Sequence, residues 1–262
     1  MKKIIALLLV LVMVFALAAC GGKDKGGDAA DGSYKTVEAG KLIMSTNAQF
    51  PPYEMVADGE GAYKGFEGID VEIAAALAEK LGLELVIDDM DFDSALTAVQ
   101  NNKSDMVLAG LTYREDRDEV MDFSTSYAKG VQVVIVTEGS DITDLDALDG
   151  KKIGTQRGTT GNIYCVDDYG EENVLAYDNG ALAVQALLNG QIDAVVIDNG
   201  PAQAYVAANE GLTILDTEYV VEDYCLAVDE GNTALLEALN GALEELIADG
   251  TVQTIVDKYI TE

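Results

Sequence analysis

Two separate stretches of the chain carry the same order of features, and this repetition is the strongest constraint on the fold. Residues 98–110 read AVQNNKSDMVLAG, and residues 186–198 read ALLNGQIDAVVID. Each stretch runs from the end of a helical pattern through a polar turn to an aspartate, and then to four apolar residues typical of a buried strand. Helix–turn–strand units are common, so two unrelated instances remain an alternative. Otherwise the chain contains two similar α/β lobes.

The rest of the chain from Lys41 onward also alternates between strand and helix patterns, which is typical of an α/β fold with mixed, mainly parallel sheets. We expect strands at 41–45, 83–87, 106–109, 131–136 and 152–155, helices at 71–81 and 94–100, and a helical turn at 145–148. Asp70 is the expected N-cap of the first helix, and Gly82 its expected end. Two final helices, 232–249 and 252–259, are expected to pack back on the first lobe.

Charge and residue inventory exclude several classes of function. The formal charge of −31 repels phosphate backbones, so we expect no nucleic-acid partner. The chain has no histidine, which excludes a Ser-His-Asp triad, a Cys-His pair and any histidine-ligated metal site. Cys165 and Cys225 are too isolated for a disulfide framework or a metal knuckle, and we expect buried thiols. We expect no metal and no cofactor.

The first residues of the chain are typical of an export signal. Lys2 and Lys3 precede an apolar stretch that is too short to remain as a membrane-spanning helix. The small residues before Cys20 resemble a bacterial lipobox, which implies removal of residues 1–19 and acylation of the Cys20 thiol. An ordinary secretory signal with a chance cysteine is the alternative. Residues 20–40 are then a lipidated flexible tether to the cell membrane.

Two segments that follow predicted strands carry groups suited to an anion. Thr112 and Arg117 come shortly after Gly110, and a hydroxyl, backbone N–H groups and a bidentate guanidinium can saturate both oxygens of a carboxylate. A surface ion-pair cluster is the alternative, and for Arg114 it is the better interpretation. The run from Gln156 to Gly161 includes Thr159 and Thr160 and offers a second anion cradle, although a turn that only starts a helix has the same composition.

Asp198 provides a negative charge, opposite to that of Arg117. It follows four apolar strand residues, in the position that corresponds to Gly110 in the other stretch. Open α/β sheets bind ligands at the carboxyl ends of their strands. Asp198 could merely cap the helix at Pro201. Beside Arg117 and Thr160, however, it supplies the acid that an α-ammonium group needs, so the three sites together describe a zwitterion.

At this point the chain resembles the amino-acid-binding family (family 3) of extracellular solute receptors for ABC importers. The resemblance covers nearly all of Lys41 to Tyr259 and rests on an ordered set of short motifs, namely FPPYE at 50–54, GIDVE at 68–72, MDF at 90–92, AGLT at 109–112 with Arg117, DFS at 122–124, GTTG at 158–161 and Asp198. It implies a two-lobe fold like the class II periplasmic binding proteins, with the ligand in a cleft between lobes joined by two hinge strands. Lobe 1 is then 41–127 and 225–262, and lobe 2 is 128–224, with hinges near 127–131 and 220–224.

The resemblance also assigns roles to individual residues. It implies that Arg117, Thr112 and the backbone at Thr160, with Thr159 beside it, hold the α-carboxylate. Asp198 and the Gly110 carbonyl hold the α-ammonium. Phe50 and Phe92 sandwich the ligand's side chain, and Asn47 and Gln156 face its tip. The alternative for each phenylalanine is ordinary core. A neutral residue at position 47 favours a polar, uncharged side chain, such as that of glutamine or cystine.

The function that follows is capture of an L-amino acid outside the cell and delivery to an ABC importer permease. We expect a monomeric, non-enzymatic receptor, anchored by lipid at Cys20 to the outer face of the cell membrane, with a Gram-positive-type surface favoured. One alternative is a prephenate-type dehydratase on the same scaffold, with Glu54 or Glu67 as its acid or base. Another is a ligand-sensing receptor that acts on a membrane partner.

Overall fold

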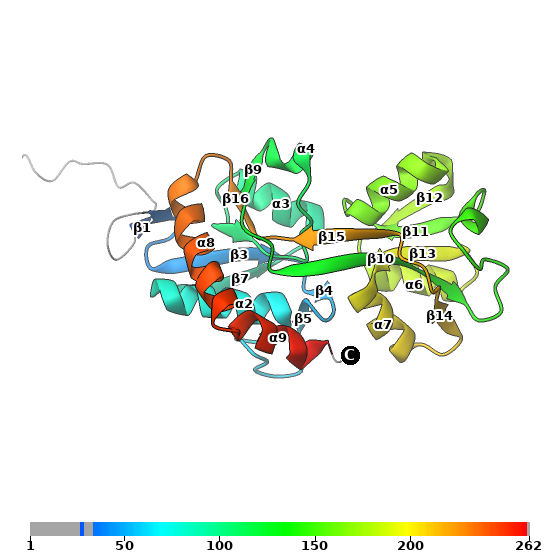
Figure 1. The fold of residues 1–262 in the computed structure, drawn as a ribbon, viewed down its shortest axis with the longest axis horizontal. Coiled ribbons are helices and arrows are strands. Elements are labelled where there is room, and N and C mark those ends of the chain that lie inside the picture. The colour runs from blue at the N-terminus through cyan, green and yellow to red at the C-terminus, as the bar shows by residue number, and fades with distance from the viewer. Residues whose placement is uncertain (1–26, 29–33, 261–262) are drawn as a thin grey trace, which may run out of the picture.

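The protein consists of two α/β lobes that lie side by side, with two strands crossing between them (Figure 1). The structure, a computed structural model, describes residues 27–28 and 34–260. The predicted signal at 1–19 and the lipidation site Cys20 lie outside the described residues. In the part of the chain that is described, no helix is both long enough and apolar enough to cross a membrane.

The first lobe is built on a five-stranded sheet with the order β7-β3-β8-β16-β9. Its strands are β7 (Glu84–Asp89), β3 (Lys41–Thr46), β8 (Met106–Val107), β16 (Ala227–Asp229) and β9 (Met121–Phe123), and its helices are α2 (Ile69–Leu81), α3 (Phe92–Gln100), α4 (Glu115–Asp118), α8 (Thr233–Ala248) and α9 (Thr251–Tyr259). Strand β3 pairs in parallel with β7 and β8, whereas β16 is antiparallel to its neighbours. The last two helices pack on α2, as predicted.

The beginning of α2 differs from the prediction. The helix ends at Gly82, which adopts the expected left-handed conformation with φ of 67°. The N-cap, however, is Gly68, and Asp70 lies inside the first turn with a fully buried side chain. The prediction of Asp70 as N-cap is wrong because its carboxylate has other partners: it accepts hydrogen bonds from the Gly110 N–H at 2.7 Å and the Tyr127 hydroxyl at 2.9 Å.

The packed part of the chain begins earlier than the sequence indicated. Strand β2 (Lys35–Thr36) pairs with β1 (Gly27–Asp28), and Tyr34 is buried in the core of the first lobe. The Val37 N–H donates to the Asp105 carboxylate at 2.6 Å, and the same side chain accepts from the Ile43 N–H at 2.7 Å. Residues 34–40 therefore belong to the packed lobe, although we had assigned them to the tether.

The second lobe is built on a sheet with the order β12-β11-β13-β10-β14, and β15 adds to β10. Its strands are β12 (Val174–Tyr177), β11 (Ile153–Gln156), β13 (Ala194–Asp198), β10 (Ala128–Thr137), β14 (Leu212–Ile214) and β15 (Val220–Tyr224), and its helices are α5 (Thr160–Tyr169), α6 (Gly180–Leu188) and α7 (Asn199–Ala208), with short 3₁₀ turns η1 (Asp146–Leu148) and η2 (Glu171–Asn173). The two repeated stretches form the corresponding units, α3 to β8 in one lobe and α6 to β13 in the other.

Strands β10 and β15 form an antiparallel pair between the lobes, visible at the centre of Figure 1. Their register places Ala128 opposite Tyr224 and Gln132 opposite Val220. The predicted hinges lie on this pair, and their exact boundaries stay a prediction.

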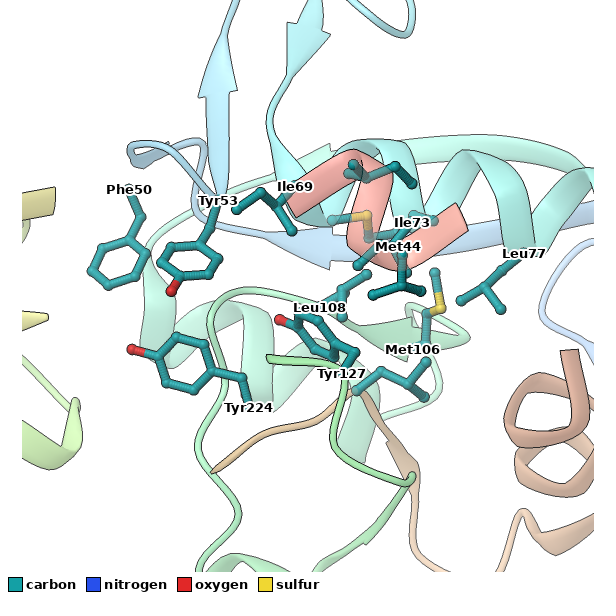
Figure 2. Packing of buried hydrophobic residues seen from close by; sticks show 14 of the residues in the cluster. Met44, Phe50, Tyr53, Ile69, Ile73, Leu77, Met106, Leu108, Tyr127 and Tyr224 are labelled. Carbon is teal, nitrogen blue, oxygen red and sulfur yellow. The ribbon is translucent and has the colours of Figure 1, made fainter. Parts of the chain in front are cut away.

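The core of the first lobe reaches to the space between the lobes. Figure 2 shows Met44, Ile73, Leu77 and Met106 packed together, with the rings of Phe50, Tyr53 and Tyr224 at one end of the cluster. The Tyr53 and Tyr224 rings meet edge to face with centroids 5.2 Å apart. Burying an aliphatic or methionine side chain stabilises a fold by about 1.5–3 kcal/mol, so this cluster holds the cleft-facing aromatic rings on a rigid base. A small antiparallel sheet of β4 (Gln49–Phe50), β5 (Glu54–Val56) and β6 (Phe66–Glu67) carries Phe50, and Tyr53 lies in the turn between β4 and β5.

Candidate ligand-binding site

A cavity lies between the two lobes and gathers all ten residues that the sequence analysis singled out. Its empty space, counted together with the space that opens to solvent, is about 410 Å³. The predicted residues that line it are Asn47, Phe50, Phe92, Gly110, Thr112, Arg117, Gln156, Thr159, Thr160 and Asp198. Six of them lie at or just after the ends of β3, β8, β11 and β13, and the others lie on β4 (Phe50) and on the helices α3 (Phe92), α4 (Arg117) and α5 (Thr160). Their role as ligand contacts stays a prediction.

Arg117 is a buried cation on α4, with 7% of its surface exposed. Its Nη1 donates to the Thr112 carbonyl oxygen at 2.9 Å, and its Nη2 donates to the Gly158 carbonyl oxygen at 3.0 Å. No salt bridge joins it to a carboxylate of the described residues. Burial, together with the nearby Arg114, lowers the pKa of Arg117 to about 10, so the group stays charged at neutral pH. The cavity therefore presents a positive charge without a paired acid. Arg114 itself makes the predicted surface ion pair, with Asp116 at 2.8 Å.

The threonines around Arg117 share an acceptor that the sequence analysis did not identify. The hydroxyls of Thr112 and Thr160 both donate to Oε2 of Glu222, at 3.2 and 2.9 Å. Thr160 opens α5, and Thr159 is its N-cap, with a side chain that accepts from the Asn162 N–H at 3.3 Å. The first N–H groups of a helix have no intrahelical partner and favour anions. This corner of the cavity thus combines a guanidinium, two hydroxyls and a helix N-terminus.

Asp198 faces the cavity from the carboxyl end of β13, and 1% of its surface is exposed. One carboxylate oxygen accepts from the Gly200 N–H at 2.9 Å and caps α7, as the simpler interpretation of the sequence held. The other accepts from the Val131 N–H of β10 at 2.9 Å. Burial raises the pKa of this carboxyl to about 6. Because a carboxylate has about four lone-pair sites, Asp198 can cap the helix and still accept a hydrogen bond from a ligand.

Gly110 is held in place by a buried acid. Its φ of 51° is a left-handed conformation that favours glycine, and a Cβ at this position would lie 2.8 Å from the Phe50 ring. Its N–H donates to Asp70. The buried Glu54 carboxyl lies near Asp70, and neither of its oxygens has a hydrogen-bond partner among the described residues. Burial raises the pKa of Asp70 to about 6. Burial and the neighbouring Asp70 raise the pKa of Glu54 well above its usual value. Glu54 also lines the cavity.

Asn47 and Gln156 meet across the cavity, one from each lobe. The Gln156 amide donates to Oδ1 of Asn47 at 3.1 Å, and the Asn47 amide donates to the Met90 carbonyl oxygen at 2.8 Å. Oε1 of Gln156 is buried without a hydrogen-bond partner among the described residues. Since a buried acceptor without a partner is costly, this oxygen is suited to a donor on a ligand.

Phe50 and Phe92 line the cavity and also belong to the hydrophobic core, so the structure combines both interpretations of these residues. The Phe92 ring lies below the Arg117 guanidinium at 5.7 Å. Phe50 stacks on Tyr53 with ring centroids 5.7 Å apart.

Several residues of the site were not predicted from the sequence. Gln132, Ile197 and Tyr224 also line the cavity, and Glu222 on β15 accepts a hydrogen bond from the Gln132 amide at 3.0 Å. The sequence did not distinguish these residues because each lies in a strand pattern, and a strand residue usually faces either the core or the solvent. The alternation in β15 did hold a clue, since it places a glutamate and a tyrosine on the same face.

Among residues 34–260, no group of three or more potential ligands could hold a metal ion. Cys165 and Cys225 are free and buried, as expected.

Comparison with known proteins identifies the family. The family model for bacterial extracellular solute-binding proteins, family 3, matches residues 42–262. A probable histidine-binding protein of Neisseria gonorrhoeae is 32% identical and covers 100% of this chain and 97% of its own length. The arginine-binding extracellular protein ArtP of Bacillus subtilis is 30% identical over 100% of this chain and 99% of its own. Other relatives are named L-cystine-binding and glutamine-binding proteins.

Solved structures agree. An ancestral arginine-binding protein bound to glutamine has a TM-score of 0.79 and 38% identity, and the match covers 85% of this chain and 99% of that one. An arginine-binding protein from T. maritima, solved as a mutant, has a TM-score of 0.79 and 35% identity, over 85% and 96% of the two chains. The chain therefore belongs to the bacterial extracellular solute-binding proteins of family 3, and its fold is that of a class II periplasmic binding protein.

Proposed function

We propose that this protein captures a single L-amino acid between its lobes and delivers it to the permease of an ABC importer. Relatives named for arginine, histidine, cystine and glutamine support amino-acid binding, and several are named as ABC transporter components. They are solute-binding proteins, which supports a non-enzymatic role. No comparison favours the dehydratase or the sensing receptor.

The observation that carries the proposal is the pairing of opposite charges across one small cavity. Arg117 offers a buried guanidinium without a paired acid, and Asp198 offers a buried carboxylate from the other lobe. A zwitterionic α-amino acid satisfies both at once. Its carboxylate is then held by Arg117, Thr112 and the helix N-terminus at Thr160, and its ammonium by Asp198 and the Gly110 carbonyl.

The far end of the cavity favours a polar, uncharged side chain. Asn47 and Gln156 offer amide groups from both lobes, and the unpartnered Oε1 of Gln156 accepts an N–H from the tip of the ligand. Neither residue carries a charge that would select a cation or an anion. Phe50 and Phe92 flank the aliphatic part of the ligand's side chain. Glutamine and cystine are the ligands we propose first.

Lobe closure supplies the binding energy. In the structure the lobes already touch, since Gln49 accepts hydrogen bonds from the Asn179 amide at 2.7 Å and the Tyr205 hydroxyl at 3.1 Å. We propose that the lobes, 41–127 with 225–262 and 128–224, move about hinges near 127–131 and 220–224. A ligand that contacts both lobes favours the closed state by its differential affinity for it.

The family places the protein outside the cytoplasm. We further propose that it is a monomer anchored by lipid at Cys20, on a Gram-positive-type surface, so that the captured amino acid stays close to the permease. Mass spectrometry of the protein purified from membranes tests the anchor: a diacylglyceryl mass on a chain that begins at Cys20 supports it, and a water-soluble chain without lipid contradicts it.

A thermal-shift screen of the twenty amino acids, cystine and ornithine tests the function. A ligand present at about 100 times its Kd stabilises the native state by about 2.7 kcal/mol, which raises Tm by several degrees. We expect the largest shift with glutamine or cystine. The largest shift with arginine would contradict the assignment of an uncharged tip, and no shift with any compound would contradict amino-acid capture.

A further inference from the structure

Glu222 occupies an unusual position for an acidic residue. On β15 the side chains alternate between two faces, and the inward face carries Glu222 while the outward face carries Val221. Glu222 is 5% exposed and Val221 is 54% exposed. A strand that buries its glutamate and exposes its valine reverses the usual preference. The buried carboxylate therefore calls for a functional explanation.

The contacts of Glu222 join three parts of the molecule. Its Oε2 accepts hydrogen bonds from the Thr112 hydroxyl of the first lobe at 3.2 Å, from the Thr160 hydroxyl at the start of α5 at 2.9 Å, and from the Gln132 amide of β10 at 3.0 Å. The negative charge of Glu222 also acts on Arg117 and raises the pKa of the guanidinium. A carboxylate of the chain itself thus binds the two hydroxyls that flank the buried guanidinium.

These are the same groups to which we assign the α-carboxylate of the amino acid. A hydroxyl has a single proton, so it can donate to only one acceptor at a time. A ligand carboxylate that binds at Arg117 must take the Thr112 and Thr160 protons away from Glu222. It also brings a second negative charge next to the first one in a buried site, where like charges repel more strongly than in water.

We propose that Glu222 is a built-in competitor for the α-carboxylate, which weakens the hold on an amino acid and so favours its release to the permease. The inference rests on the proposed position of the ligand carboxylate. In this account Glu222 is a specificity-determining residue that acts through the two threonines, and it does not itself contact the amino acid. Its effect is confined to ligands with an α-carboxylate.

The test compares acids with amides. Isothermal titration measures the affinity of the wild type and of Glu222→Gln for the amino acid that gives the largest thermal shift, and for its α-amide, which keeps the ammonium and side chain but lacks the carboxylate charge. We expect Glu222→Gln to bind the acid about tenfold more tightly and to change the affinity for the α-amide less than twofold.

Asp223→Asn is the matched control. It makes the same charge change on the same strand, but Asp223 is exposed and pairs with Lys129 at 2.8 Å on the opposite face. We expect it to alter neither affinity. If Glu222→Gln does not fold, Glu222→Asp replaces it, because its shorter side chain withdraws the charge and is expected to give a smaller gain with the same selectivity.

Equal or weaker binding of the acid by the folded variant, or the same gain for the acid and its α-amide, would overturn the inference while leaving the proposed function intact. A wild type that binds no amino acid of the thermal-shift screen would overturn both. A purely structural role for Glu222 predicts losses that do not depend on the α-carboxylate.

Discussion

The Nη2 group of Arg117 donates a hydrogen bond to the Gly158 carbonyl oxygen at 3.0 Å, so a buried cation of the first lobe is tied to a loop of the second. The same guanidinium is anchored in its own lobe by the Thr112 carbonyl. This places a charged group where both lobes can share one ligand. It also makes Arg117 the residue whose loss is expected to affect binding most.

Arg117→Ala is expected to weaken amino-acid binding by roughly a hundredfold or more, because the ligand carboxylate would be buried without its cation. Isothermal titration with the amino acid identified by the thermal-shift screen measures the change. Arg114→Ala is the control, since Arg114 carries the same charge three residues away but pairs with Asp116 at the surface. Near wild-type affinity in Arg117→Ala would contradict the site.

The affinity for an amino acid is expected to fall as the pH drops through about 6. The pKa of Asp198 is raised to about 6 by burial, and only the charged carboxylate pairs with the ligand's ammonium. Protonation below that pH therefore removes the charge that the ammonium needs. Titrations between pH 5 and 8 test this.

Asp198→Asn provides the comparison for the pH experiment. Its amide oxygen can still cap α7 by accepting from the Gly200 N–H, but its NH2 group cannot accept from the Val131 N–H, so urea unfolding is used to check that the variant is folded. We expect roughly tenfold weaker binding at pH 8 and a flatter pH profile. A profile with the same slope as the wild type would show that Asp198 is not the titrating group.

Glu54→Gln is expected to stabilise the protein at pH 8. The native pKa of Glu54 is raised well above its usual value by burial and by the neighbouring Asp70, whereas the unfolded state has a pKa of about 4.3. Above that pH the native state binds more protons than the unfolded state, so stability falls as the pH rises. A neutral isostere escapes this loss and is expected to raise the free energy of unfolding.

Urea unfolding at pH 4 and pH 8 measures the effect of Glu54→Gln. The gain is expected at pH 8 and is expected to be small at pH 4, where the native side chain is neutral and most unfolded chains also carry the proton. Glu60→Gln is the control because Glu60 is exposed, and it should change neither value. A destabilisation of Glu54→Gln at pH 8 would mean that the charged form of Glu54 is favoured in the fold.

Gly110→Ala is expected to lower both the stability of the fold and the affinity for the ligand. Alanine at this left-handed position is expected to cost about 1–2 kcal/mol of stability. Its Cβ would also push against the Phe50 ring and shift the Gly110 carbonyl proposed to hold the ammonium. Gly190→Ala is the matched control, with φ of 66° and no atom within 4 Å of the added carbon. Urea unfolding should show a larger loss of stability for Gly110→Ala than for Gly190→Ala, because only the first adds a contact with the Phe50 ring, and only Gly110→Ala should lose ligand affinity. If Gly110→Ala and Gly190→Ala bind the ligand equally well, Gly110 does not contribute to binding.

The sequence predicted the placement of the site because its residues follow strand ends, and the ends of strands meet between lobes of this kind. Hydrophobic periodicity identified α2 and the two final helices to within two residues. It could not identify the start of α2, where the Asp70 side chain pairs with Gly110 and Tyr127, both distant in sequence. An N-cap preference is local, and these tertiary hydrogen bonds overrode it.

The role of Glu222 was hidden for a similar reason. Its partners Thr112, Gln132 and Thr160 lie on three different elements that only the packed lobes bring together. Likewise, the packing of Tyr34 depends on a pocket formed by distant parts of the first lobe, so the short polar segment around it was assigned to the tether.

The most direct test of the account is a crystal structure of the protein with the amino acid that gives the largest thermal shift. We predict that its α-carboxylate lies within hydrogen-bond distance of the Arg117 guanidinium and that its ammonium contacts the Asp198 carboxylate. An amino acid bound elsewhere, or bound in the same cavity with these two ends reversed, would contradict the central claim.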